Sequence, residues 1–102
     1  MDNVTINGIE YRPLNKTNEA LKIVVLQRGW VYIGRYSRDK SECRLDNAFC
    51  IRIWGTTKGL GELRDGPTSS TKIDKAGTVE FHRISEIMTI DCDEEKWKNH
   101  LK

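Results

Sequence analysis

The stretch KIVVLQRGWVYIGRYSRDKSECRLDNAFCIRIW, residues 22–54, decides the fold class of this 102-residue chain. Three runs rich in β-branched and aromatic residues, at 23–27, 30–36 and 43–54, are separated by Arg28-Gly29 and by a polar segment at 37–42. Such runs favour strands over helices. The stretch therefore predicts a three-stranded β-meander whose third strand bends near Asp46-Asn47.

Side-chain alternation divides the third of these strands into two faces. Phe49, Ile51 and Ile53 share one face, and Cys50, Arg52 and Trp54 share the other. Because the first set is entirely apolar, we expect it to face the core.

Outward from the meander, the chain predicts few other elements. Asn7-Gly8 favours a type I′ hairpin within residues 1–14. A short helix is expected at 56–66, capped by Thr56 or Thr57 and ended by Gly66-Pro67. A polar loop (68–77), strands within 78–92 and an Asp93-capped helix at 93–102 follow. The prediction is one domain over residues 1–102, mostly β, either a small curled β-barrel or a compact β-sandwich, with a short mid-chain helix and a C-terminal helix.

The composition predicts a small core and a reducing environment. Hydrophobic residues make up 37% of the chain and charged residues 31%, so we expect a homo-oligomeric interface to supplement the core. No apolar run of ~18 residues predicts a membrane span, and residues 1–3 do not resemble a secretory signal. Three cysteines without a CxxC pair indicate reduced thiols in the cytoplasm and no zinc site.

The middle of the chain is basic. Residues 28–58 carry seven Lys or Arg and three acidic residues, a net charge of +4, whereas residues 59–102 are net −2. The middle segment is therefore suited to attract an anion, although a solvated charged face on the strands is the simpler explanation.

The segment IWGTTKGLGELRDGP, residues 53–67, is the first candidate binding site. A helix N-terminus suits phosphate, and glycines allow a close approach of the backbone. We expect Trp54 to stack on a ring, Thr56, Thr57, Lys58 and Gly59 to bind phosphate, and Arg52 with Arg28 to add positive charge. The segment is not a P-loop, because it lacks the GK[ST] ending. An ordinary capped turn is the alternative.

Arginines and aromatic residues alternate through the meander, which suggests stacking combined with phosphate contacts, or else packing in a core or interface. Trp30, Tyr32 and Tyr36 are expected on one strand face and Arg35 on the other.

No catalytic constellation is visible, and we expect neither an enzyme nor a cofactor. Folding would have to bring Cys50 and His82 together for nucleophilic chemistry. The acidic run DCDEE at 91–95 suits a helix cap better than a metal site.

Residues 22–54 resemble the first half of Sm-like and SH3-like small barrels: an apolar strand, a glycine turn, a strand ending in glycine, a polar turn and LDNA in the next strand. The resemblance implies a small barrel and RNA binding. The family's second RNA-binding motif, an apolar residue followed by Arg-Gly, has no later counterpart, which argues against a nucleic-acid partner.

The segments LDNAFCIRIW, WGTTKGLGEL and IDCDEEKW resemble small proteins encoded by bacteriophages and prophages. This resemblance implies a bacterial cytoplasm during infection, where such proteins sequester nucleotide immune signals or bind host proteins. The leading hypothesis is a homo-oligomeric, non-enzymatic protein that sequesters a small phosphorylated, nucleotide-like ligand. The alternatives are an inhibitor or adaptor that binds a host protein, and an Sm-like RNA binder.

Overall fold

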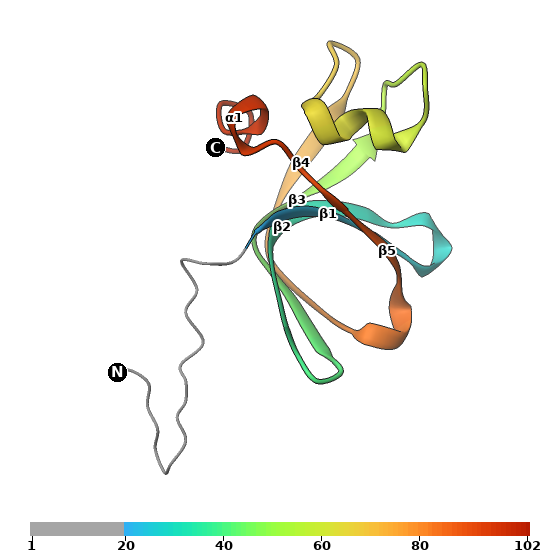
Figure 1. Ribbon diagram of the computed structural model, residues 1–102, viewed down its shortest axis with the longest axis vertical. Helices are drawn as coiled ribbons and strands as arrows, with labels where there is room; N and C mark the ends of the chain where they lie inside the picture. Colours follow the sequence, from blue (N-terminus) through green and yellow to red (C-terminus); the bar gives the residue numbers. More distant parts are fainter. Residues whose placement is uncertain (1–19) are drawn as a thin grey trace.

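Five antiparallel strands form one curled sheet in this computed structural model, which describes residues 20–102 (Figure 1). The strands are β1 (Leu21–Leu26), β2 (Val31–Asp39), β3 (Glu42–Ile53), β4 (Lys72–His82) and β5 (Glu86–Asp91), in the order β4-β3-β2-β1-β5. The predicted mostly β fold class is therefore confirmed, as one curled sheet rather than two packed sheets. The hairpin expected at residues 1–14 lies outside the described residues.

Two tight turns connect the meander. The 3₁₀ helix η2 (Gln27–Gly29) joins β1 to β2, and both Arg28 and Gly29 have positive φ angles, of 71° and 82°. The next turn is shorter than the polar segment predicted at 37–42, because β2 continues to Asp39 and β3 begins at Glu42. Pairing between Asp39 and Glu42 holds these polar residues in the ladder.

The bend predicted in β3 is present at Asn47, which has a φ of 52°. The pairing register with β2 shifts between Ile33 and Arg35, and the register with β4 shifts on both sides of Ala48. Gly34 permits the close approach of β2 to β3 at this point, since a Cβ at position 34 would lie only 3.1 Å from the Ala48 Cα. The sheet curls where its central strands are irregular.

The mid-chain helix differs from its prediction. It is a 3₁₀ helix, η3, over Leu60–Asp65, and its N-cap is Gly59 without a side-chain cap bond. Neither Thr56 nor Thr57 caps it, so that expectation was wrong. Gly66 ends the helix at a φ of 109°, as its position predicted.

The segment between η3 and α1 also needs correction. Residues 72–77, expected in a loop, belong to β4 because they pair with the second half of β3. Strand pairing thus overrides the low β-propensity of the sequence KIDKAG. The 3₁₀ helix η4 (Arg83–Ser85) separates β4 from β5, and His82 Nδ1 accepts a hydrogen bond from the backbone N–H of Ile84.

The C-terminal helix α1 (Glu94–Trp97) is shorter than the expected element over 93–102. The predicted cap is correct, since the Asp93 carboxylate accepts from the backbone N–H groups of Glu95 and Lys96. Trp97 is fully buried, and Leu101 packs against the same core cluster.

Apolar side chains pack on both sides of the curled sheet. One cluster lies between the sheet and the segments η3 and α1, which cover the same end of the sheet in Figure 1. It contains Leu21, Ile23, Val31, Ile33, Phe49, Ile51, Leu63 and Trp97. The second cluster contains Val24, Leu26, Leu45 and Ala48. Phe49 and Ile51 are buried as predicted, but Ile53 is 46% exposed because β3 extends beyond its pairing with β2 at Cys50.

Candidate functional site

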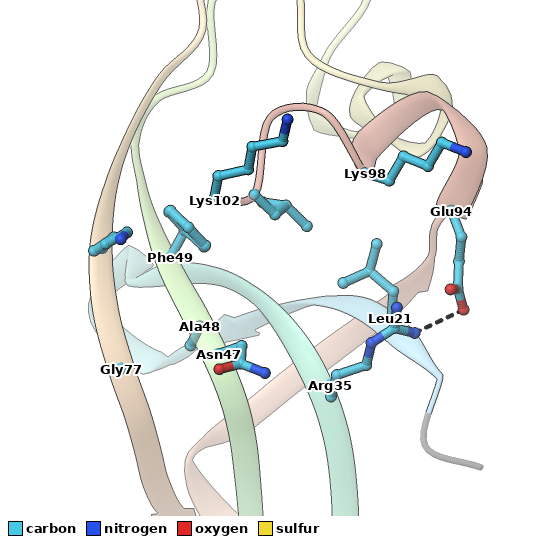
Figure 2. A pocket seen from close by; sticks show the side chains of 11 residues that line it. Leu21, Arg35, Asn47, Ala48, Phe49, Gly77, Glu94, Lys98 and Lys102 are labelled. Carbon is cyan, nitrogen blue, oxygen red and sulfur yellow. Dashed lines mark ion pairs between the residues drawn. The ribbon is translucent and has the colours of Figure 1, made fainter. Parts of the chain in front are cut away.

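A cavity of about 380 Å³ lies between the curled sheet and the C-terminal segment (Figure 2). Its volume is at the lower end of the range of ~300–1,000 Å³ typical of small-molecule sites. Four strands and the segment beginning with α1 contribute its lining: Leu21, Arg35, Asn47, Ala48, Phe49, Lys75, Gly77, Glu94, Lys98, Leu101 and Lys102.

The irregular parts of three strands meet at this cavity. Arg35 follows the register shift in β2, Asn47 is the left-handed residue of β3, and Gly77 is a left-handed residue of β4 with a φ of 76°. Gly77 pairs with Ala48, the residue next to Asn47. Bulges bend strands and re-aim side chains, and they are frequent beside functional sites. The local irregularity therefore opens the space that the cavity occupies.

The lining of the cavity is strongly basic. Among the described residues of the lining, Arg35, Lys75, Lys98 and Lys102 give four positive charges, and Glu94 is the one acidic residue. Within residues 20–102, neither Lys75 nor Lys102 forms an ion pair. A net charge of +3 in one concave surface attracts small anions.

Carboxylates at the start of α1 pair with the two other cations. Arg35 Nη1 lies 2.8 Å from Glu94 Oε2, and Lys98 Nζ lies 3.0 Å from Glu95 Oε1. The hydrogen bond from Arg35 holds the pKa of Glu94 below its ordinary value. Glu94 is therefore a fixed anion at the edge of the cavity, beside the Arg35 guanidinium in Figure 2.

The wall formed by residues 94–102 is anchored in the core. The Trp97 indole N–H donates to the carbonyl oxygen of Leu63 over 2.8 Å, and the backbone N–H of Asp93 donates to the carbonyl of Arg64 over 2.9 Å. Both bonds join the segment to η3. Lys98 follows Trp97 directly and Lys102 lies five residues after it, so this anchor helps to position both at the cavity.

The predicted loop site has a different geometry from the one expected. The backbone N–H groups of Thr57 and Lys58 both donate to Glu62 Oε1, each over 3.0 Å. A phosphate bound to these amides would have to displace that carboxylate. Thr68 and Thr71 hold the other side of the loop through hydroxyl bonds of 2.6 Å to the carbonyls of Gly55 and Trp54.

The remaining predicted binding residues lie outside the cavity. Arg52 Nε lies 2.7 Å from Asp74 Oδ2, and this hydrogen bond raises the pKa of Arg52. The carboxylate of Asp74 offsets the positive charge that Arg52 would offer to a ligand. Arg28 is exposed in η2, and Trp54 is 43% exposed at the end of β3. The cavity is lined by none of the predicted residues Arg28, Arg52, Trp54, Thr56, Thr57, Lys58 and Gly59. Phosphate binding at the loop stays a prediction.

Sequence reasoning missed the cavity residues because each had a local explanation. Asn47 was interpreted only as part of a bend, Lys75 as part of a loop, and Lys98 with Lys102 as part of the C-terminal helix expected at 93–102. The spacing of four residues between Lys98 and Lys102 was the available signal, since it predicts that two cations share one side of a turn. Arg35 was expected opposite the aromatic residues of β2, and it does lie on the other face.

The nucleophilic pair and the acidic run considered from the sequence can both be located within residues 20–102. His82 pairs with Glu42 and Cys50 with Asp74, at different ends of β3, so the fold does not bring Cys50 and His82 together. No group of three His, Cys, Asp or Glu side chains in these residues is arranged to hold a metal ion. Burial raises the pKa of the Cys92 thiol to about 12. Among the described helices, none has the length and apolar character needed to cross a membrane.

No family model, curated protein or solved structure matches this chain significantly.

Proposed function

We propose that this protein binds a small phosphorylated, nucleotide-like ligand without catalysing a reaction. The observation that carries the proposal is the cavity of about 380 Å³ with four cationic side chains in its lining. Phosphate binding by lysine and arginine depends on charge and on several converging donors. The cavity supplies the charge from several side chains, and its apolar residues Leu21, Phe49 and Leu101 suit the remainder of an organic phosphate.

In this proposal Lys75 and Lys102 are the first contacts of the phosphate. They come from different segments, Lys75 from β4 and Lys102 from the chain after α1, and neither has a carboxylate partner within residues 20–102. Arg35 and Lys98 add positive potential while they remain paired with α1. The loop residues 54–59 are the competing site, since the sequence favoured them.

Calorimetric titration with ribose 5-phosphate and adenosine 5′-monophosphate tests the proposal. We expect Lys75→Glu combined with Lys102→Glu to abolish binding. Lys72→Glu, on the same strand but outside the cavity, is the matched control and should bind like the parent. Trp54→Ala and Lys58→Glu test the loop site. Absence of binding by the parent, or loss of binding only in the loop variants, would overturn the assignment to the cavity.

The proposed setting is the cytoplasm of a phage-infected bacterium, where a homo-oligomer of this protein sequesters a nucleotide immune signal. The resemblance to phage-encoded proteins and the small core support this setting. Among residues 20–102, β4 and β5 are the edge strands of the sheet. Edge strands carry unpaired backbone groups that can pair with a strand of another subunit. Native mass spectrometry tests the setting through the number of subunits and any retained ligand mass.

One observation favours the alternative of a host-protein inhibitor or adaptor. Trp30 beside η2 and Ile84 in η4 are 56% and 74% exposed, and Ile87 and Met88 on β5 are also exposed. A hydrogen bond of 3.0 Å from the Gln27 side chain to the Ile84 carbonyl places η2 beside η4. Exposed apolar side chains that gather in one area are typical of protein-binding surfaces. An inhibitor of this kind would bind a host partner while showing no ligand-dependent rise in melting temperature.

The Sm-like RNA binder remains a third hypothesis, supported by the resemblance over residues 22–54 alone. Its affinity for single-stranded RNA would fall steeply as salt concentration rises.

A further inference from the structure

Of the residues at positions 20–102 that line the cavity, Asn47 is the one with an uncharged polar side chain. Its left-handed backbone, with a φ of 52°, lies at the point where the pairing of β3 with β4 shifts register. The Asn47 amide forms no hydrogen bond within the part of the chain that the structure describes, so its donor and acceptor are both available to a ligand.

The cavity has two chemically different sides. In Figure 2, Lys98 and Lys102 lie along the upper rim, whereas Asn47 and Ala48 lie along the lower one. A phosphate held near Lys102 would leave the other end of an elongated ligand near Asn47. Phe49 and Leu21 line the space between these sides and provide apolar surface for a planar group.

An amide offers a hydrogen-bond donor and an acceptor side by side. The edge of a nucleobase carries the complementary pair, as in the contacts that asparagine makes with adenine. A sugar phosphate has hydroxyl groups but no such planar edge. An amide at position 47 is therefore suited to distinguish ligands by the presence of a base.

Building on the proposed function, we infer that the ligand of the cavity is a nucleotide whose base edge is recognised by the Asn47 amide. Asn47 is a specificity-determining residue in this proposal, and the cations supply affinity for the phosphate.

Titrations of the parent and of Asn47→Gly with adenosine 5′-monophosphate and ribose 5-phosphate test the inference. These ligands share a sugar phosphate and differ in the base. Glycine suits the left-handed backbone, so this variant removes the amide without introducing strain. We expect the parent to bind the nucleotide roughly tenfold more tightly than the sugar phosphate. Asn47→Gly should lose that preference while its affinity for ribose 5-phosphate stays unchanged.

The possible failures are distinguishable. Equal binding of both ligands by the parent would overturn base recognition and leave the proposed function in place. A nucleotide preference that survives in Asn47→Gly would show that other residues read the base, and would likewise overturn the inference. If the parent binds neither ligand, the proposed function fails together with the inference.

Discussion

The Trp97 indole N–H and the Leu63 carbonyl oxygen form a hydrogen bond of 2.8 Å between two fully buried residues. Trp97 is the last residue of α1, and Leu63 lies in η3, so the bond joins two short helices that are far apart in the chain. A helix of four residues has little stability of its own. The position of the basic wall of the cavity therefore depends on this tryptophan.

Replacing Trp97 should lower the free energy of unfolding in two steps. Trp97→Phe keeps most of the apolar surface and removes one of two donors to the Leu63 carbonyl, which still accepts from the Gly66 N–H over 3.0 Å, so the cost is about 0.5–1.5 kcal/mol. Trp97→Ala adds a large void and should cost about 3–5 kcal/mol. Urea denaturation measures both values. An unfolding free energy of Trp97→Phe equal to that of the parent would show that the hydrogen bond is not a stabilising anchor.

Glu94→Gln should increase the affinity for a phosphorylated ligand. The substitution removes a negative charge from the lining and breaks the 2.8 Å ion pair between Glu94 and Arg35. We expect a gain of roughly twofold to fivefold, in line with the energy of an exposed ion pair. Calorimetric titration with adenosine 5′-monophosphate measures the change.

The stability of Glu94→Gln should differ little from the parent, by less than about 1 kcal/mol, because both partners are substantially exposed. Asp65→Gln, which neutralises an exposed acidic residue outside the cavity, is a control for net charge. An equal gain in both variants would mean that overall charge, rather than Glu94, governs the affinity.

Tyr36 should make the stability of the protein decrease at alkaline pH. Its hydroxyl donates to Glu86 Oε1 over 2.6 Å, and burial and this bond raise the pKa of Tyr36 above its ordinary value. Because the folded pKa exceeds the unfolded one, the stabilisation is fully present below about pH 10 and is lost as the pH rises further.

Tyr36→Phe tests that contribution. The variant should lose about 1.5–3 kcal/mol near neutral pH, since the lost hydrogen bond has a charged acceptor. Its unfolding free energy should also fall less steeply above pH 10. Parallel pH profiles of the parent and the variant would contradict the assignment to Tyr36.

Glu62→Ala should loosen the loop at 54–59 without weakening ligand binding in the cavity. It removes the acceptor of the Thr57 and Lys58 backbone amides, so hydrogen exchange at these two positions should accelerate. The affinity for adenosine 5′-monophosphate should remain that of the parent. A clear gain in affinity would indicate that the two released amides bind phosphate, as the sequence originally suggested.

Local signals in the sequence were sufficient for much of the sheet. Alternating apolar residues identified the burial of Phe49 and Ile51. The bend predicted near Asp46-Asn47 is present at Asn47, a residue type that tolerates a left-handed backbone. Asp93 was recognisable as a cap from its position before two glutamates and a tryptophan. These features depend on interactions within a few residues, which a single sequence reports well.

The remaining features depend on contacts between residues far apart in the chain, which the sequence alone did not predict. Lys72 and Lys75 belong to a strand because β3 pairs with them, although their own segment favours a loop. The cations of the cavity come from positions 35, 75, 98 and 102, whose proximity no sequence spacing reports. Glu62 did carry a local signal: it is the third residue of η3, where a glutamate commonly turns back to bind amides before the helix.

Residue-resolved NMR titration with adenosine 5′-monophosphate tests the central claim most directly. If the ligand occupies the cavity, saturable shift changes should appear in the backbone amide signals of Asn47, Lys75, Gly77 and Lys98. Thr57 and Lys58 should stay unchanged. Changes confined to Thr57, Lys58 and their neighbours would move the site to the loop, and the absence of any saturable change would contradict nucleotide binding altogether.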